Sequence, residues 1–406
     1  MSTLIVKGNR HLSGRVNVSG SKNAALPIMF ATLVTGGVSI IRGVPRIADV
    51  DVAAEILTDL GADVRWDGGS LVIDTSRAKY KKPREELIKK IRASSYLLGA
   101  ALSRFGETCV QDFGGCNFDK RPIDMHVCVM KSMGAAECDG RFTARTLVGT
   151  DIAFKTVSVG ATVNAILLGV RAKGKTSIYG YAREPHVLSL VDFLCRAGAD
   201  IKVFTDRIEI SESELQGAQT TVIPDMIEAG TYVSLSMMIQ SPFSICGIDP
   251  THLSSYFATL SLAGADFAFS HDSVRVISNV NRAVNIIAEP YPAFPTDLQP
   301  ITAPLLAAYY GGEISDKVWP RRFGYLADLA KFGIMSEIEY GRALIRKSCI
   351  AASSASAPDL RGGAALLLCA LLAKGESRIE NSEIIRRGYH DVVGKLRLLG
   401  AEIEEI

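Results

Sequence analysis

The chain has 406 residues, which is too long for one ordinary hydrophobic core, so we expect at least two domains. Its composition, 48% hydrophobic and 22% charged residues, is that of a globular protein. The net charge of +2 excludes a global electrostatic attraction to nucleic acid or to a membrane surface, so any anion site must be built locally.

Six helical stretches end in a similar glycine-led step, from DLGADV at the first to LLGAEI at the last. Glycine suits a helix end because the left-handed conformation there costs it little. The six glycines are Gly61, Gly134, Gly198, Gly264, Gly333 and Gly400. Because they are spaced 73, 64, 66, 69 and 67 residues apart, a unit of about 65–70 residues recurs six times.

Each unit has the same predicted parts. In the first, a short strand around residues 38–42 precedes a helix in which Val52, Ile56 and Leu60 share one face. A hairpin over residues 63–74 then alternates apolar and polar residues about a DGG turn. Strands that alternate with helices predict an α/β fold, and six units divide naturally into two domains of three.

Lys22 and Asn23 are the first candidate site residues in chain order. They follow Ser19-Gly20-Ser21 and precede a predicted helix with Pro27 in its first turn. An ammonium group at a glycine-containing helix entry suits an anion, although the segment around Lys22 lacks the GxxxxGK[ST] pattern of a phosphate-binding loop. The alternative for Lys22 is a solvated surface lysine.

The second candidate in chain order is a single thiol, that of Cys116, in a glycine-rich loop. Cys116 follows two glycines in FGGCNFDKRPIDMH, residues 113–126. The nearby Lys120 and Arg121 favour the reactive thiolate, while Asp119 opposes it. Cys116 is therefore a candidate reactive thiol, and the alternative is an inert loop cysteine.

Asp297 is the third candidate and lies in a proline-rich turn, EPYPAFPTDLQP, residues 289–300. Pro292 and Pro295 stiffen the backbone, so we expect the carboxylate to be held in a fixed place, as a general base requires. The alternative is that Asp297 caps a helix that begins at Leu298.

Three arginines complete the candidate set. Arg92, Arg361 and Arg387, taken singly, are more typical of surface charges than of ligand contacts. If several of these guanidinium groups converge, they would suit a multiply charged phosphate compound.

Cysteine usage and hydropathy indicate the compartment. The eight cysteines are scattered without a CxxC pair or a zinc-like cluster, which is typical of reduced thiols in a cytosol. The longest apolar stretches, near residues 24–34 and 364–373, are shorter than the roughly 20 residues that cross a bilayer. We therefore predict a cytoplasmic protein, with no nucleic acid and no membrane among its partners.

Taken together, the motifs resemble the UDP-N-acetylglucosamine 1-carboxyvinyltransferase family of enolpyruvyl transferases, and the resemblance covers essentially the whole chain. The matching segments, in the family's order, are SGSKNAALPI, VPRIADVD, IRASSYLLGAALSRFG, GGCNFDKRPIDMH, SVGATVN, AREP, IEAGTY, PAFPTDLQ, DLRGGAALLL and RRGY followed by KLRLLGA. Several motifs in one order are far more specific than any single motif.

The resemblance implies a fold. It is a two-domain inside-out α/β barrel of six βαβαββ-type repeats, three per domain, with the active site in the cleft between the domains. The implied first domain is residues 21–228, with the Cys116 loop as its lid. Residues 1–20 and 229–406 would form the second domain.

The resemblance also implies a reaction. The enolpyruvyl (1-carboxyvinyl) group of phosphoenolpyruvate passes to the 3-hydroxyl of UDP-N-acetylglucosamine through a tetrahedral intermediate, and phosphate leaves. This is the first committed step of peptidoglycan synthesis. The family needs no metal and no organic cofactor.

Three catalytic positions follow from the resemblance. Cys116 matches the thiol that acts as acid or assists turnover and that fosfomycin alkylates. Asp297 matches the residue taken as base on the sugar hydroxyl, and Lys22 matches a position that binds phosphoenolpyruvate. Implied substrate contacts are Arg92, Arg121 and Arg387 around phosphoenolpyruvate, Asn23 for the sugar, Arg121, Pro122, Ile123, Asp124 and Met125 for uridine, Ser158, Val159 and Gly160 for the diphosphate, Val318 near the nucleotide sugar, and Asp359 and Arg361 in the second domain.

Four positions depart from the family's usual pattern. Pro320 begins PRRF where ENRF is common, and Arg386 lies in IIRRGY where HIDRGY is common. His186 ends REPH in place of REPE, and Met226 lies in DMIE in place of DRIE. Two alternatives stay open: an enolpyruvyl transferase that uses another uridine nucleotide, and a non-catalytic homologue that binds a nucleotide sugar.

Overall fold

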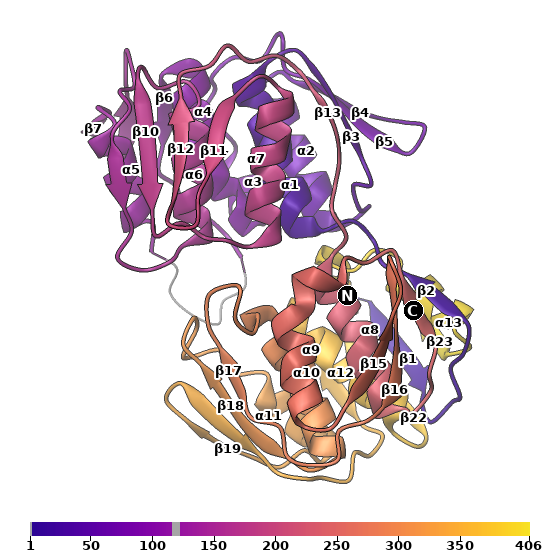
Figure 1. Ribbon diagram of the computed structural model, residues 1–406. Helices are drawn as coiled ribbons and strands as arrows, with labels where there is room; N and C mark the ends of the chain where they lie inside the picture. The colour runs from indigo at the N-terminus through magenta and orange to yellow at the C-terminus, as the bar shows by residue number, and fades with distance from the viewer. Residues whose placement is uncertain (1, 116–121) are drawn as a thin grey trace. The chain divides into compact units, whose positions relative to one another are not determined.

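The computed structural model describes residues 2–115 and 122–406. These residues divide into two compact units, each with its own hydrophobic core (Figure 1). The first unit holds residues 20–115 and 122–223, and the second unit holds residues 2–19 and 224–406. The division after residue 223 precedes helix α8 (Met226–Met238), whereas the implied domain boundary at residue 228 falls inside that helix.

Three buried helices form the core of the first unit: α1 (Lys22–Thr35), α4 (Leu97–Phe105) and α6 (Val159–Gly169). They are apolar around most of their circumference, as enclosed helices are. Helices that bury mainly one face, and short turns, surround them. These are α2 (Ala48–Asp59), α3 (Glu85–Ile88), η1 (Arg92–Tyr96), α5 (Asp124–Ser132) and α7 (Pro185–Arg196).

The second unit repeats this plan around α8, α10 (Gln299–Ala308) and α12 (Leu360–Leu372), whose residues are almost all buried. The other helical segments are η2 (Pro250–Leu253), α9 (Ser254–Leu262), η3 (Thr296–Leu298), α11 (Leu326–Leu329), η4 (Ala330–Phe332), η5 (Ser382–Arg387) and α13 (Val392–Leu398).

Three sheets pack against the helices of the first unit. Their strand orders are β13-β3-β5-β4, β11-β12-β10-β9 and β6-β8-β7. The strands are β3 (Val38–Arg42), β4 (Asp63–Asp67), β5 (Ser70–Asp74), β6 (Glu107–Cys109), β7 (Ala136–Cys138), β8 (Arg141–Thr143), β9 (Asp151–Ala153), β10 (Lys175–Tyr179), β11 (Asp200–Val203), β12 (Arg207–Ser211) and β13 (Gln219–Thr221).

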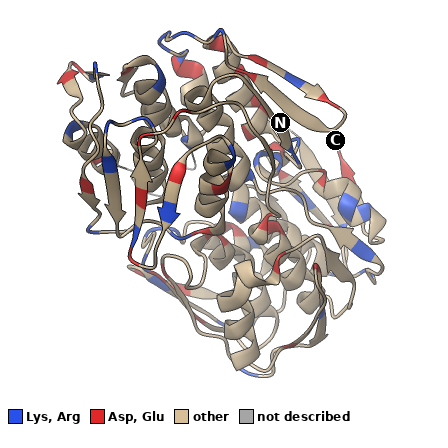
Figure 2. Cartoon of the chain, turned by 45° about the horizontal axis from the view of Figure 1, so that its top comes forward, with Lys and Arg blue, Asp and Glu red and all other residues tan. Residues whose placement is uncertain are grey.

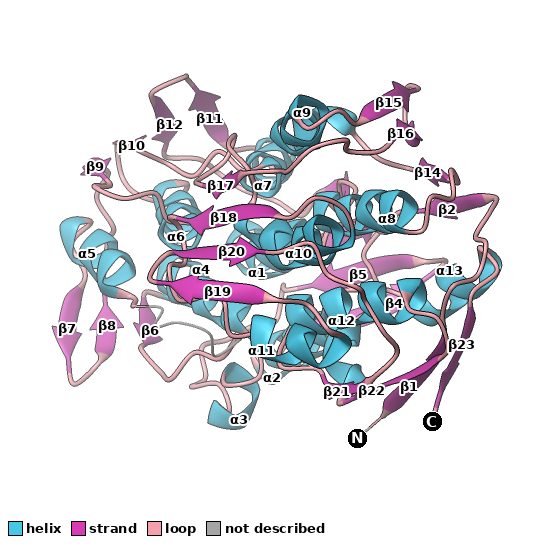
Figure 3. Cartoon of the chain, turned by 90° about the horizontal axis from the view of Figure 1, so that it is seen from below, coloured by secondary structure: helices cyan, strands magenta, loops and turns pink. Residues whose placement is uncertain are grey.

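The second unit has three four-stranded sheets, ordered β21-β22-β1-β23, β15-β16-β14-β2 and β17-β18-β20-β19, the last of which is seen well in Figure 3. Each contains one parallel pair, β21 with β22, β14 with β2, and β17 with β18. The strands are β1 (Thr3–Lys7), β2 (Arg15–Asn17), β14 (Ser244–Cys246), β15 (Asp266–Phe269), β16 (Ser273–Ser278), β17 (Ile286–Ala288), β18 (Gly312–Asp316), β19 (Ser336–Glu339), β20 (Arg342–Ile345), β21 (Ser354–Ser356), β22 (Glu376–Glu380) and β23 (Glu402–Glu405).

The six-fold repeat predicted from the glycine steps is confirmed. All six glycines have a positive φ, between +87° and +106°, and each follows a helical segment. The DGG hairpin is also confirmed: β4 pairs antiparallel with β5, and Gly68 and Gly69 have φ of +52° and +84°, as a type I′ turn requires. The expectation for Pro27 is wrong, because α1 begins at Lys22 and Pro27 lies inside the helix.

The composition is nearly balanced in charge, with 45 Lys and Arg against 43 Asp and Glu. Figure 2 shows basic and acidic residues interspersed over both units, in keeping with the net charge of +2. Within residues 2–115 and 122–406, no helix combines the length and the apolar character needed to cross a membrane.

Candidate active site

Asp297 lies in η3, and its carboxylate contacts two buried arginines. Oδ1 accepts a hydrogen bond of 2.7 Å from Nη1 of Arg322, and Oδ2 accepts bonds of 3.0 and 3.2 Å from Nη2 and Nε of Arg361. The helical turn begins at Thr296, so Asp297 does not occupy the cap position, and the capping alternative is wrong. Both oxygens of a carboxylate in a rigid turn are thus fixed by charge-assisted hydrogen bonds.

The guanidinium group of Arg361 is 3% exposed, and burial alone would lower its pKa. The carboxylate of Asp297 outweighs this effect, so the pKa of Arg361 is raised and the side chain stays charged. Its Nη1 atom is buried and has no hydrogen-bond partner among the described residues. The site therefore presents a buried, charged donor that an anionic ligand could satisfy.

The N-terminal end of α12 places Arg361. Asp359 is the cap residue, and its Oδ1 accepts hydrogen bonds from the backbone N–H groups of Arg361 and Gly362 at 2.8 and 3.0 Å. The cap explains why the arginine side chain starts from a fixed backbone. Arg387, also a predicted site residue, is half-buried at the end of η5, which packs against α12.

In the first unit, Lys22 is the first residue of α1, and Asn23 follows it. The Nζ atom of Lys22 lies 3.2 Å from Oδ2 of Asp49, a buried residue in the first turn of α2. The lysine side chain is itself mostly buried, so the solvated alternative for Lys22 is wrong. Asp49 holds the ammonium group beside the N-terminal end of a long buried helix, where an anion is favoured.

The predicted diphosphate turn opens a second buried helix of the first unit. Ser158 caps α6 by accepting a hydrogen bond of 3.3 Å from the N–H of Ala161, and Val159 and Gly160 begin the helix. A Cβ on Gly160 would lie only 2.7 Å from Nε2 of His126, so glycine lets α6 approach α5 closely. The free N–H groups of this end suit a phosphate.

His126 joins this turn to other predicted residues. It is buried in α5, which begins at Asp124, directly after Pro122 and Ile123. Met125 accepts a long contact of 3.8 Å from the hydroxyl of Thr156, which ties the start of α5 to the segment before α6. Arg92 is close enough to act electrostatically on His126.

We expect His126 to make the protein less stable in mild acid. Burial, aided by the charge of Arg92, lowers the pKa of His126 from 6.5 to about 4. Between these values the unfolded chain binds a proton that the folded chain does not, so stability is full above pH 6.5 and falls toward pH 4. The loss is on the order of 3 kcal/mol, at about 1.4 kcal/mol per pKa unit.

The measurement is the midpoint of urea denaturation as a function of pH, followed by the fluorescence of Trp66, in the first unit, in a Trp319→Phe background. A His126→Leu variant should lose most of the acid dependence that the unaltered chain shows, whereas His271→Leu, at an exposed histidine, should keep it. Equal acid dependence in His126→Leu and in the unaltered chain would refute this account of His126.

Most of the predicted residues that the structure describes lie at the ends of helical segments. Lys22, Asn23, Arg92, residues 122–125 and residues 158–160 lie in the first unit; Asp297, Val318, Asp359, Arg361 and Arg387 lie in the second. Cys116 and Arg121 lie outside the described residues. The sequence interpretation missed Arg322, Asp49 and His126. These residues lie in the segments PRRF, VPRIADVD and GGCNFDKRPIDMH, but no pattern within those segments singled them out.

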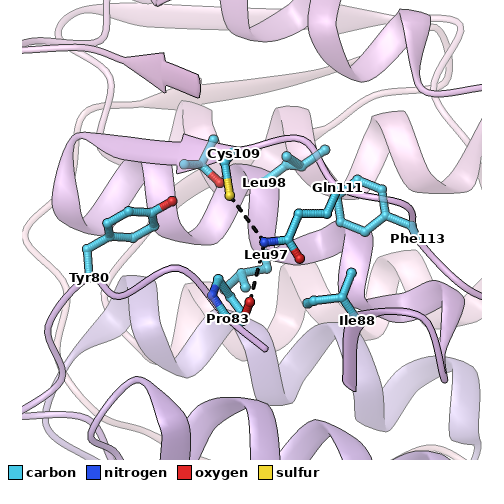
Figure 4. A pocket seen from close by; sticks show the side chains of 9 residues that line it. Tyr80, Pro83, Ile88, Leu97, Leu98, Cys109, Gln111 and Phe113 are labelled. Atoms are coloured by element: carbon cyan, nitrogen blue, oxygen red, sulfur yellow. Dashed lines mark hydrogen bonds between the residues drawn. The ribbon is translucent and has the colours of Figure 1, made fainter. Parts of the chain in front are cut away.

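A small apolar pocket in the first unit is separate from these residues (Figure 4). The amide nitrogen of Gln111 lies between the carbonyl of Pro83, at 3.4 Å, and the sulfur of Cys109, at 3.3 Å. Tyr80 and Phe113 also line the pocket. None of the predicted site residues that the structure describes lines it, so we do not take this pocket as the candidate active site.

Comparisons with known proteins identify the family of the chain. A family model described as EPSP synthase (3-phosphoshikimate 1-carboxyvinyltransferase) matches residues 6–396. UDP-N-acetylglucosamine 1-carboxyvinyltransferase 2 of Streptococcus mutans is 37% identical, over 100% of this chain and 99% of its own length. The UDP-N-acetylglucosamine 1-carboxyvinyltransferase of Clostridium botulinum is 39% identical, over 99% of both chains.

Solved structures extend the match. The crystal structure of the enolpyruvyl transferase NikO from Streptomyces tendae is 26% identical, with a TM-score of 0.88 over 100% of this chain and 99% of NikO. EPSP synthase from Acinetobacter baumannii, 18% identical with a TM-score of 0.71, shares the fold. The expected two-domain enolpyruvyl transferase fold is thus confirmed. The chain belongs to the UDP-N-acetylglucosamine 1-carboxyvinyltransferase family of enolpyruvyl transferases.

Proposed function

We propose that this protein is a transferase that moves the enolpyruvyl group of phosphoenolpyruvate to the 3-hydroxyl of UDP-N-acetylglucosamine. The products are the enolpyruvyl ether of the nucleotide sugar and inorganic phosphate. In the cell this step would commit the sugar to peptidoglycan. The observation that carries the proposal is the carboxylate of Asp297, fixed between two buried guanidinium groups in a chain 37–39% identical to enzymes of that name.

The chemistry calls for an acid and a base. C3 of phosphoenolpyruvate accepts a proton, which makes C2 electrophilic, and the sugar oxygen then bonds to C2 as its own proton passes to a base. In the second half, C3 gives up a proton, the C2=C3 bond forms again and the bond from C2 to the phosphate oxygen breaks. Asp297 is the proposed base, and Cys116 is proposed as the acid or as the residue that assists turnover.

Cationic residues are proposed to hold the phosphoenolpyruvate. The negative charge of its phosphate would be stabilised by the ammonium group of Lys22, which Asp49 holds in place, and by the guanidinium groups of Arg92, Arg121 and Arg387. The buried Nη1 donor of Arg361, which has no hydrogen-bond partner among the described residues, is proposed to bind an anionic group of the substrate. An anion there would complete the hydrogen bonding of a donor that is otherwise unsatisfied.

The nucleotide sugar is proposed to bind at the helix ends of the first unit, and Val318 remains a further proposed contact from the family resemblance. Residues 122–125 lie at the start of α5 and suit uridine, and the α6 end at residues 158–160 suits the diphosphate. Asn23 is proposed to contact the sugar, and Asp359 to fix the backbone from which Arg361 projects.

Asp49 provides a test of the Lys22 assignment. Asp49→Asn removes the charge that fixes the ammonium group, and a hydrogen bond to a charged group is worth about 1.5 kcal/mol, so we expect KM for phosphoenolpyruvate to rise roughly tenfold. The matched control is Asp59→Asn, which breaks an ion pair with Arg84 at the other end of the same helix and should leave KM unchanged. A rise in KM for the nucleotide sugar alone would contradict the assignment.

A second candidate is the same transfer to another uridine nucleotide. Two observations favour it. His186, which is buried in α7, replaces the Glu that family members commonly have, and Met226, which begins α8, replaces their Arg. The change at Arg386 does not bear on the acceptor, because the exposed guanidinium group of Arg386 forms an ion pair with Glu405 of β23 at the surface.

A panel of acceptors separates the candidates. Phosphate release from phosphoenolpyruvate is measured with UDP-N-acetylglucosamine, UMP, other uridine nucleotides and shikimate 3-phosphate, and kcat/KM is compared. The proposal expects UDP-N-acetylglucosamine to be preferred by at least about 100-fold, a discrimination of roughly 3 kcal/mol. Preference for another uridine nucleotide would favour the second candidate, and tight binding of the nucleotide sugar without turnover would indicate a non-catalytic homologue.

A further inference from the structure

Asp316 is a buried carboxylate beside the proposed base and has no assigned role. It is the last residue of β18 and is 1% exposed. Its Oδ1 accepts hydrogen bonds of 2.9 and 2.8 Å from the backbone N–H groups of Val318 and Trp319. Asp316 therefore fixes the turn that carries Val318, a proposed contact of the nucleotide sugar.

The other oxygen of Asp316 reaches the turn that carries the base. Oδ2 accepts a hydrogen bond of 2.6 Å from the hydroxyl of Thr296, the residue directly before Asp297. The Thr296 oxygen in turn accepts a bond of 3.2 Å from Nη1 of Arg322, and the same nitrogen donates to Asp297 at 2.7 Å. One continuous chain of hydrogen bonds thus runs from Asp316 through Thr296 and Arg322 to the base.

This chain has a defined polarity. Since the Thr296 hydroxyl donates its only proton to Asp316, its oxygen lone pairs face Arg322 and can only accept. The guanidinium nitrogen is thereby shared between Thr296 and Asp297. A carboxylate at position 316 is needed for this arrangement, because an amide nitrogen in place of Oδ2 would donate to Thr296 and compete with Arg322.

Burial is consistent with a fixed role. Burial raises the pKa of Asp316, and two backbone N–H groups, the hydroxyl of Thr296 and the nearby charge of Arg322 oppose this rise because they favour the carboxylate. Arg322 is itself 4% exposed, and its backbone carbonyl accepts a bond of 3.1 Å from the side chain of the buried Gln299. The network is held from several elements of the second unit.

We propose that Asp316 is a positioning residue for enolpyruvyl transfer, joining the turn of the base to the turn that contacts the nucleotide sugar. This inference rests on the proposed function, in which Asp297 is the base. Asp316 touches neither substrate; it acts through Thr296 and Arg322 on the direction of the Asp297 carboxylate, and through the two backbone N–H groups on Val318.

Three variants separate the effect of Asp316 on the Asp297 carboxylate from its effect on the Val318 turn. Asp316→Asn keeps an oxygen for the N–H groups of Val318 and Trp319 but loses the acceptor for Thr296, so kcat should fall about 10- to 100-fold while KM for UDP-N-acetylglucosamine changes less than about threefold. Thr296→Val should do the same. Asp316→Ala frees both turns and should also raise KM for the nucleotide sugar.

Coupling and rescue distinguish positioning from a general loss of structure. The double variant Asp316→Asn with Thr296→Val should be no worse than the more damaging single variant, because both break one chain. Thr296→Ser restores the hydroxyl and should recover most of the turnover lost in Thr296→Val. Asp249→Asn is the matched control, since Asp249 makes the same two kinds of contact, to the N–H and hydroxyl of Thr251, on the exposed surface.

Full turnover in Asp316→Asn, additive losses in the double variant, or no rescue by Thr296→Ser would overturn the proposal. The outcome stays distinct from a failure of the proposed function. If Asp297→Asn is inactive while Asp316→Asn has normal kcat, only the positioning role is wrong. If Asp297→Asn keeps normal kcat, or the unaltered protein fails to use UDP-N-acetylglucosamine, the proposed function is wrong and the positioning role with it.

Discussion

Replacing Asp297 with asparagine should lower kcat for enolpyruvyl transfer by about 10³-fold, since general base catalysis contributes roughly 10²- to 10⁴-fold. The amide has the shape of the carboxylate but cannot accept the proton of the sugar hydroxyl. It also offers Arg322 and Arg361 only one acceptor oxygen in place of two. The measurement is steady-state phosphate release with both substrates saturating.

The control for this variant is Asp328→Asn, which breaks a surface ion pair with Lys331 in the same unit and should leave kcat unchanged. A kcat for Asp297→Asn within about tenfold of the unaltered protein would contradict the assignment, because the smallest usual contribution of a general base is larger.

Replacing Arg361 with methionine should lower kcat/KM for phosphoenolpyruvate by about 10²- to 10³-fold, the usual effect of removing one charge-stabilising donor. Methionine fills part of the same space, but Oδ2 of Asp297 loses both of its hydrogen bonds from Arg361. Lysine should not restore activity, because a single ammonium group cannot reproduce the forked contact. Arg346→Met, which removes a surface arginine paired with Glu337, is the control. Activity in Arg361→Lys close to that of the unaltered chain would contradict the forked contact.

The same two variants should differ in stability. Asp297→Asn leaves two buried guanidinium groups without their shared carboxylate and should destabilise the second unit by about 3 kcal/mol. Arg361→Met should cost less, because one carboxylate still faces one guanidinium group. Combining the changes should recover part of the loss from Asp297→Asn.

Unfolding of the second unit can be followed by the fluorescence of Trp319 in a Trp66→Phe background, since the chain has only these two tryptophans. This separation is needed because two units need not unfold together. Strictly additive losses in the combined variant would show that the charges of Asp297 and Arg361 do not depend on each other.

Much of the fold could be predicted because its signals are local. The backbone of a helix end decides whether glycine is needed there, and all six predicted glycines adopt that backbone. The pairing of distant strands has no such local signal. Strand β1, near the start of the chain, pairs with β22 and β23 near its end, and β3 pairs with β13 some 180 residues away.

In the candidate site, too, local features could be predicted and contacts between distant residues could not. The rigid turn around Asp297 could be predicted because prolines act on their own backbone. Its partners could not, since Arg322 and Arg361 follow Asp297 by 25 and 64 residues and meet it only in the folded unit. The capping alternative failed for a related reason: the sequence did not show that the helical turn begins at Thr296. Lys22 was equally ambiguous until Asp49 was placed beside it.

The most direct test of the central claim is the joint dependence of phosphate release on the two substrates. We expect one phosphate and one enolpyruvyl ether of UDP-N-acetylglucosamine to form for each phosphoenolpyruvate consumed, with neither product when one substrate is left out. Phosphate release from phosphoenolpyruvate that does not depend on the nucleotide sugar, or turnover with another acceptor but none with this one, would contradict it.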